Sequence, residues 1–129
     1  MPVRSVLIVD DSPAIRKVVC ELFASESDFE VCGQAENGRE AVEKAKLLQP
    51  ALIVTDLYMP LMNGLEETRI LKRLMPAVPV ILYSAHLDSF MAKEAQRAGA
   101  SAVVSKSDAA AVLIGKRGNY YTRSPLNFF

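Results

Sequence analysis

Polar residues follow four of the five apolar runs in this sequence. Asp10 and Asp11 come after "VLIV", and the ends of the runs "ALIVTD", "VPVILYS" and "SAVVSK" are Asp56, Ser84 and Lys106. If these runs are parallel strands, their carboxyl ends meet at the edge of the sheet where open α/β sheets bind ligands. Two carboxylates 4 Å apart repel by about 4 kcal/mol at an effective dielectric near 20. Three together therefore need a cation, unless one of them takes up a proton.

The types of these residues predict phosphoryl chemistry. Carboxylate oxygens without histidine or usable cysteine select a hard ion, Mg²⁺ or Mn²⁺. A carboxylate beside such an ion can attack phosphorus and form an aspartyl phosphate. The cation and Lys106 would neutralise the phosphoryl oxygens, and Ser84 would donate a hydrogen bond to one of them.

Each residue taken alone also has a structural interpretation. Asp10 and Asp11 could introduce a helix at Ser12, and Asp56 could form a turn before Pro60. Serines are common in loops, and a single lysine is usually a solvated charge. The repeated placement of polar residues at the ends of apolar runs favours a shared pocket.

The elements that would hold this pocket alternate between strands and helices. Short β-branched runs at 6–9, 29–35, 51–56, 78–84 and 101–106 are typical of strands that are covered on both faces. Amphipathic stretches separate them, with Ser12 as an N-cap, Pro13 at the first helical position, and stops at Pro50, Pro76 and Gly99. Such alternation predicts an α/β fold with a doubly wound five-stranded parallel sheet. Strand order 2-1-3-4-5 would make strands 1 and 3 neighbours.

Composition excludes several classes of protein. The 129 residues suit one domain, and the 15 basic and 15 acidic side chains give no electrostatic basis for binding nucleic acid or an anionic membrane. We find no signal peptide and no apolar run near the roughly 20 residues of a membrane span, so we expect a cytoplasmic protein. Cys20 and Cys32 lie in apolar patterns and are expected to be buried free thiols rather than a disulfide.

Together these features resemble the receiver domain of bacterial response regulators. The resemblance to these CheY-like modules rests on "VLIVDDSPAIR", "TDLYMPLMNG", "YSAH" and "AGASAVVSK" and on the spacing between them. "KSDAAAVLIGK" is most similar to receivers of the NarL/FixJ kind, which precede a helix-turn-helix domain. We expect a receiver domain over residues 1–116, with a flavodoxin-like fold and a fifth helix from 107 to 116. Residues 117–129 would form an atypical C-terminal tail.

The resemblance implies a role for each residue at the strand ends. Asp56 would be the phosphoacceptor, Ser84 the switch hydroxyl and Lys106 the cation that binds the phosphoryl group. Mg²⁺, for which Mn²⁺ could substitute, would be held by Asp11, Asp56 and the main-chain carbonyl of Tyr58, and by Asp10 through water. The phosphoryl donor would be a histidine kinase or a phosphotransfer protein. Receivers of this kind often form homodimers through helix 4, strand 5 and helix 5.

Three features depart from the family pattern. Ser107 stands where most receivers have a proline after the lysine, Val103 stands where many have an aromatic residue, and the tail does not continue the fifth helix. The chain could therefore be a stand-alone switch or the receiver part of a transcription factor. His86 and Tyr58 are expected at the mouth of the pocket.

Two other classes of protein fit the sequence less well. An aspartyl-nucleophile phosphatase would need an Asp-x-Asp motif, whereas Asp10 and Asp11 are adjacent. A flavodoxin-like cofactor binder would need a Ser/Thr/Gly-rich phosphate loop where this chain has "DDSPAIR".

Overall fold

The computed structural model describes residues 3–59, 61–85 and 87–105, in which strands and helices alternate. The strands are β1 (Arg4–Val9), β2 (Phe29–Ala35), β3 (Leu52–Asp56), β4 (Val80–Ser84) and β5 (Ala102–Ser105). The helices are α1 (Pro13–Ala24), α2 (Gly38–Leu48), α3 (Gly64–Leu74) and α4 (Ser89–Ala98). The expected fifth helix at 107–116 and the tail at 117–129 lie outside the described residues.

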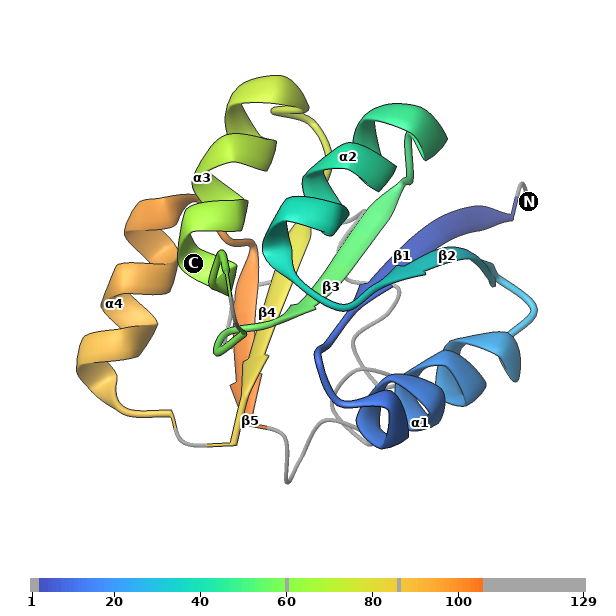
Figure 1. Ribbon diagram of the computed structural model, residues 1–129, viewed down its shortest axis with the longest axis horizontal. Coiled ribbons are helices and arrows are strands. Elements are labelled where there is room, and N and C mark those ends of the chain that lie inside the picture. The colour runs from blue at the N-terminus through green and yellow to red at the C-terminus, as the bar shows by residue number, and fades with distance from the viewer. Residues whose placement is uncertain (1–2, 60, 86, 106–129) are drawn as a thin grey trace.

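All five strands form one parallel sheet in the order β2-β1-β3-β4-β5, as the sequence predicted. The helix α1 covers one face, and α2, α3 and α4 cover the other (Figure 1). Strands β1 and β3 are parallel neighbours, so their carboxyl ends lie beside each other at one edge of the sheet.

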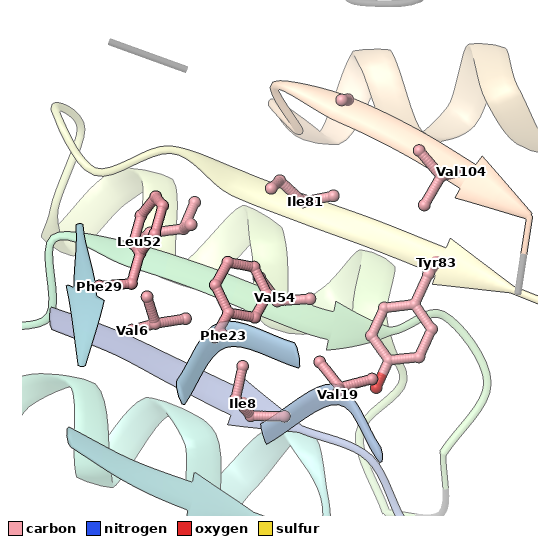
Figure 2. Close-up of a cluster of buried hydrophobic side chains, with 11 residues drawn as sticks. Val6, Ile8, Val19, Phe23, Phe29, Leu52, Val54, Ile81, Tyr83 and Val104 are labelled. Atoms are coloured by element: carbon pink, nitrogen blue, oxygen red, sulfur yellow. The ribbon is translucent and has the colours of Figure 1, made fainter. Parts of the chain in front are cut away.

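The core consists of apolar layers on the two faces of the sheet. On the α1 face, Val19 and Phe23 pack over inward-facing residues of the strands, among them Tyr83 (Figure 2). On the opposite face, β1 and β3 side chains pack against α2 and α3, and Leu82 and Val103 pack against α4. Among the described residues no helix is both long enough and apolar enough to cross a bilayer.

The helix ends follow from local sequence. Ser12 accepts a hydrogen bond from the Ile15 amide and caps α1, which confirms the predicted start. Asn37 and Asn63 cap α2 and α3 in the same way. Gln49 ends α2 in the left-handed conformation immediately before Pro50, and Gly99 does so for α4.

The cysteines are free thiols, but they are less buried than the sequence indicated. Both are only partly buried, and burial raises the pKa of each thiol. Cys32 is an extra residue in β2, because Val6 pairs with Val31 and Leu7 with Gly33. At this bulge the Cys32 thiol donates to the Val6 carbonyl of the neighbouring strand β1 at 3.4 Å.

Candidate functional site at the carboxyl edge of the sheet

Three carboxylates meet where β1 and β3 end. One ligand oxygen from each of Asp10, Asp11 and Asp56 lies within 4.8 Å of the other two. Asp10 and Asp56 are buried, whereas Asp11 is exposed. The predicted acidic cluster is therefore present, with one side open to solvent.

Neutral donors hold the Asp10 carboxylate from two directions. The Ser12 amide donates to Oδ1 at 2.8 Å, and the Tyr83 hydroxyl lies 2.8 Å from Oδ2. The Asp10 carbonyl accepts a 2.6 Å hydrogen bond from Nη1 of Arg16, whose Nε also donates to Gln34. The loop between β1 and α1 is thus fixed at its side chain and at its backbone.

The turn after β3 brings backbone groups close to Asp56. The Tyr58 amide donates to Asp56 Oδ1 at 3.3 Å, and the Leu57 amide donates to the Tyr83 carbonyl at 2.9 Å. Helix α3 begins at Gly64, next to this turn, where a β-carbon on Gly64 would lie 2.5 Å from the Asp56 carbonyl oxygen. Only glycine permits so close an approach at this position.

The other predicted residues divide into two groups. Ser84 is fully buried at the end of β4 and pairs with Ser105, and Val103 is buried against α4. Tyr58 is exposed beside the cluster. Lys106, Ser107 and His86, for which the sequence also gave predictions, lie outside the described residues.

A fourth acidic side chain lies behind the cluster, and the sequence interpretation missed it. Glu67 on α3 is completely buried, and its Oε1 accepts a 2.7 Å hydrogen bond from the Thr55 hydroxyl. Within the described part of the chain, no group bonds to its Oε2. Burial raises the pKa of Glu67 to about 8. The hydrogen bond from Thr55 lowers this pKa, and the charge of Asp56 raises it by a smaller amount.

Sequence signals for the missed residues exist. Glu67 falls on the inward stripe of α3 with Gly64, Thr68 and Leu71, where a charged residue is unusual. Tyr83 carries a hydroxyl within β4, in which every other residue except Ser84 is apolar. Their partners cannot be read from spacing, because Tyr83 and Asp10 are 73 residues apart.

The donor set fits a hard divalent cation. Carboxylate oxygens dominate it, and one of the three side chains is exposed, which leaves room for the water that Mg²⁺ normally retains. Within the described residues, no histidine or cysteine joins the cluster, as softer metals would require.

The chain belongs to the response regulator receiver domain family, whose sequence model matches residues 6–116. It is 43% identical over 111 residues to protein-glutamate methylesterase/protein-glutamine glutaminase 3 of Paramagnetospirillum magneticum. That alignment covers 82% of this chain but only 30% of the methylesterase. The chain thus spans a minor part of such relatives.

Solved structures agree with this fold. The receiver domain of NarL from Mycobacterium tuberculosis superimposes with a TM-score of 0.89 at 23% identity, over 95% of this chain and 100% of that one. A chain of the CheX-CheY-BeF3-Mg²⁺ complex from Borrelia burgdorferi gives 0.86 at 27% identity, over 95% and 92% of the two chains. The family and fold are those that the sequence predicted.

Proposed function

We propose that this chain is a phosphorylation-controlled signalling switch in which Asp56 accepts a phosphoryl group. The observation that carries the proposal is the grouping of Asp56 with Asp10 and Asp11 within 4.8 Å at the end of β3. A histidine kinase or a phosphotransfer protein would be the donor. A carboxylate oxygen of Asp56 forms the new bond to phosphorus, the P–N bond to the donor imidazole breaks, and its electron pair returns to the imidazole nitrogen.

The acidic residues have distinct roles in this proposal. Asp11, Asp56 and the Tyr58 carbonyl hold Mg²⁺ (Mn²⁺ can substitute), and Asp10 holds it through water. When bound, the cation supplies positive charge next to the phosphoryl oxygens. The Ser84 hydroxyl and the ammonium group of Lys106 bind those oxygens, so that the new charge at Asp56 has a hydrogen-bond donor and a cation as partners.

The output surface is formed by helix 4, strand 5 and helix 5. Ser84 ends β4, directly before the loop that leads to α4. A Ser84 hydroxyl that follows the phosphoryl oxygens would move this loop and the adjacent face, through which two copies of the chain could also pair. The chain acts as a phosphoacceptor and assists its own dephosphorylation. It is not a turnover enzyme.

We further propose that the switch comprises residues 1–116 and that residues 117–129 are a separate tail. We also place this module in the cytoplasm, and its equal numbers of acidic and basic residues give no electrostatic basis for binding nucleic acid or membrane by itself. Its partners would be proteins. A transcription factor containing this receiver is the alternative setting, in which another domain contacts DNA.

The test is labelling with acetyl phosphate and Mg²⁺ followed by peptide mass spectrometry. We expect one acid-stable, hydroxylamine-labile phosphoryl group on Asp56 and none in Asp56→Asn. Asp28→Asn is the matched control, because Asp28 is exposed at the opposite edge of the sheet, where its carbonyl bonds to Arg4. Label on Ser84 or His86, or steady turnover of a phosphate ester, would overturn the proposal.

A further inference from the structure

We propose that Tyr83 is a positioning residue that fixes the Asp10 carboxylate for cation binding. This inference rests on the proposed function, because it concerns the same acidic cluster. Tyr83 is fully buried, and its hydroxyl oxygen lies 2.8 Å from Asp10 Oδ2 and 3.1 Å from the Val9 carbonyl oxygen. Figure 2 shows the ring extending from β4 toward Val19 and Ile8, with the hydroxyl oxygen at that end.

The sheet topology explains how Tyr83 reaches Asp10. Tyr83 pairs with Asp56 on β3, and β3 in turn pairs with β1. Neighbouring strands are about 4.8 Å apart, so a tyrosine ring on the α1 face can cross over β3 and place its hydroxyl at the end of β1. A shorter side chain at position 83 could not span this distance.

The hydroxyl is a donor to Asp10. A phenol has one proton to donate, and the shorter contact is with the carboxylate, which accepts stronger hydrogen bonds than a neutral carbonyl. Burial, together with the nearby charge of Asp10 and the hydrogen bond to it, raises the pKa of Tyr83 well above its ordinary value. The short contact is therefore one in which the hydroxyl donates and the carboxylate accepts.

Two fixed donors define the orientation of the Asp10 carboxylate. The Ser12 amide bonds to Oδ1 and the Tyr83 hydroxyl to Oδ2, so rotation of the carboxylate would break both bonds. An ionised carboxylate has about four acceptor positions. With two of them occupied by these donors, the directions of the other acceptor positions on Asp10 are fixed before a cation binds. Partners that orient a metal-binding carboxylate in this way typically change metal affinity 10- to 100-fold when removed.

Loss of the Tyr83 hydroxyl should therefore weaken cation binding without dismantling the core. Tyr83→Phe keeps the ring that packs with Val19 and Val104 in the layer under α1. It leaves the buried Asp10 carboxylate with the Ser12 amide on Oδ1 but without the Tyr83 donor on Oδ2, so its orientation is less strictly defined. A residue that only filled the core would change stability alone.

The test is a titration of the metal-free protein with Mg²⁺, in which isothermal calorimetry and amide NMR measure binding. We expect Tyr83→Phe to bind Mg²⁺ about tenfold or more weakly than the parent. Phe23→Leu is the matched control, because Phe23 is buried in the same core layer as Tyr83 but packs against Phe29, which pairs with Arg4 at the opposite end of β1 from Asp10. It should lose stability but retain the affinity of the parent for Mg²⁺.

The outcomes separate this inference from the proposed function. Equal or tighter Mg²⁺ binding by Tyr83→Phe, with the parent binding normally, overturns the positioning role alone. A parent that binds no Mg²⁺ and takes no phosphoryl group at Asp56 overturns both. Equal weakening in Phe23→Leu overturns the positioning role, since loss of stability would then account for the effect.

A second measurement needs no variant, which matters if Tyr83→Phe does not fold. In parent protein labelled with carbon-13 at the tyrosine ζ position, the Tyr83 signal reports on the hydrogen bond of its hydroxyl. Saturating Mg²⁺ should shift this signal, because the cation withdraws charge from the Asp10 carboxylate that accepts the bond. An unmoved Tyr83 signal, while backbone amides around Asp56 do shift, overturns the positioning role.

Discussion

The hydroxyl of Thr55, the residue immediately before Asp56, donates a 2.7 Å hydrogen bond to Oε1 of Glu67. The Glu67 carboxyl is completely buried between α3 and the sheet, and its pKa of about 8 means that it is mainly protonated at neutral pH. The neutral form of Glu67 spares Asp56 a further negative charge nearby.

This arrangement predicts that Glu67 makes stability depend on pH. The pKa of Glu67 is raised from 4.5 to about 8 on folding, so between these values the folded state binds a proton that the unfolded chain lacks. The free energy of unfolding should therefore fall as pH rises through this window and level off above it. A pKa difference of one corresponds to about 1.4 kcal/mol. The total effect of Glu67 should thus reach several kcal/mol.

Urea titrations of the parent and Glu67→Gln at several pH values measure this effect. The stability of Glu67→Gln relative to the parent should increase from about pH 5 to above pH 8, because the amide has no charge to bury. Glu43→Gln on the exposed side of α2 is the control and should show no such trend. A pH-independent difference between Glu67→Gln and the parent would contradict the assignment.

The acidic cluster should destabilise the metal-free protein. Because the carboxylates of Asp10, Asp11 and Asp56 repel one another within 4.8 Å, Asp11→Ala or Asp56→Asn should raise the melting temperature without Mg²⁺ by a few degrees. Added Mg²⁺ should stabilise the parent by about 2.7 kcal/mol at a hundredfold excess over its Kd. Differential scanning calorimetry checks both effects. If neither variant gains stability and Mg²⁺ has no effect on the parent, the three carboxylates do not act as one site.

The glycine that begins α3 should be required for the shape of the site. In Gly64→Ala the new β-carbon would lie 2.5 Å from the Asp56 carbonyl oxygen and 2.9 Å from Leu57 Cα. Backbone must move to relieve these contacts, so we expect a loss of about 1–3 kcal/mol and slower labelling of Asp56 by acetyl phosphate. In Gly33→Ala the closest contact is the end of the flexible Leu48 side chain, so this control should change little. Similar losses in both variants would refute a specific role for Gly64.

Ser84 should carry the signal from the phosphoryl group to α4. Ser84→Ala should still accept a phosphoryl group at Asp56 but lose most of the change at α4, because one donor to the phosphoryl oxygens is missing. Backbone amide NMR with and without beryllofluoride measures this change. Val103 has too little volume to replace the aromatic residue that many receivers have there, so the movement should not depend on an aromatic rotation. Equal shifts of the α4 amides in the parent and Ser84→Ala would exclude this route.

Much of this site follows from sequence because short-range rules apply to it. β-branched runs, Ser12, Pro13 and Gly99 set the elements, and a parallel sheet brings the carboxyl ends of its strands to one edge. The grouping of Asp10, Asp11 and Asp56 needed only that topology and the order of strands. The limits of the elements were less well predicted, since β1 begins at Arg4 rather than at residue 6 and β4 begins at Val80 rather than at residue 78.

The contacts behind the carboxylates were decided by tertiary structure. Whether Tyr83 bonds to Asp10 depends on the register of three strands, and whether Glu67 is buried with Thr55 depends on how α3 packs. Both contacts join residues distant in the chain, and a one-residue change of register would turn Tyr83 to the opposite face. The sequence alone determined which charged residues gather at the edge of the sheet. Only the packed structure determined which neutral groups hold them there, because hydrogen bonds depend on distances of a few ångströms that spacing along the chain does not encode.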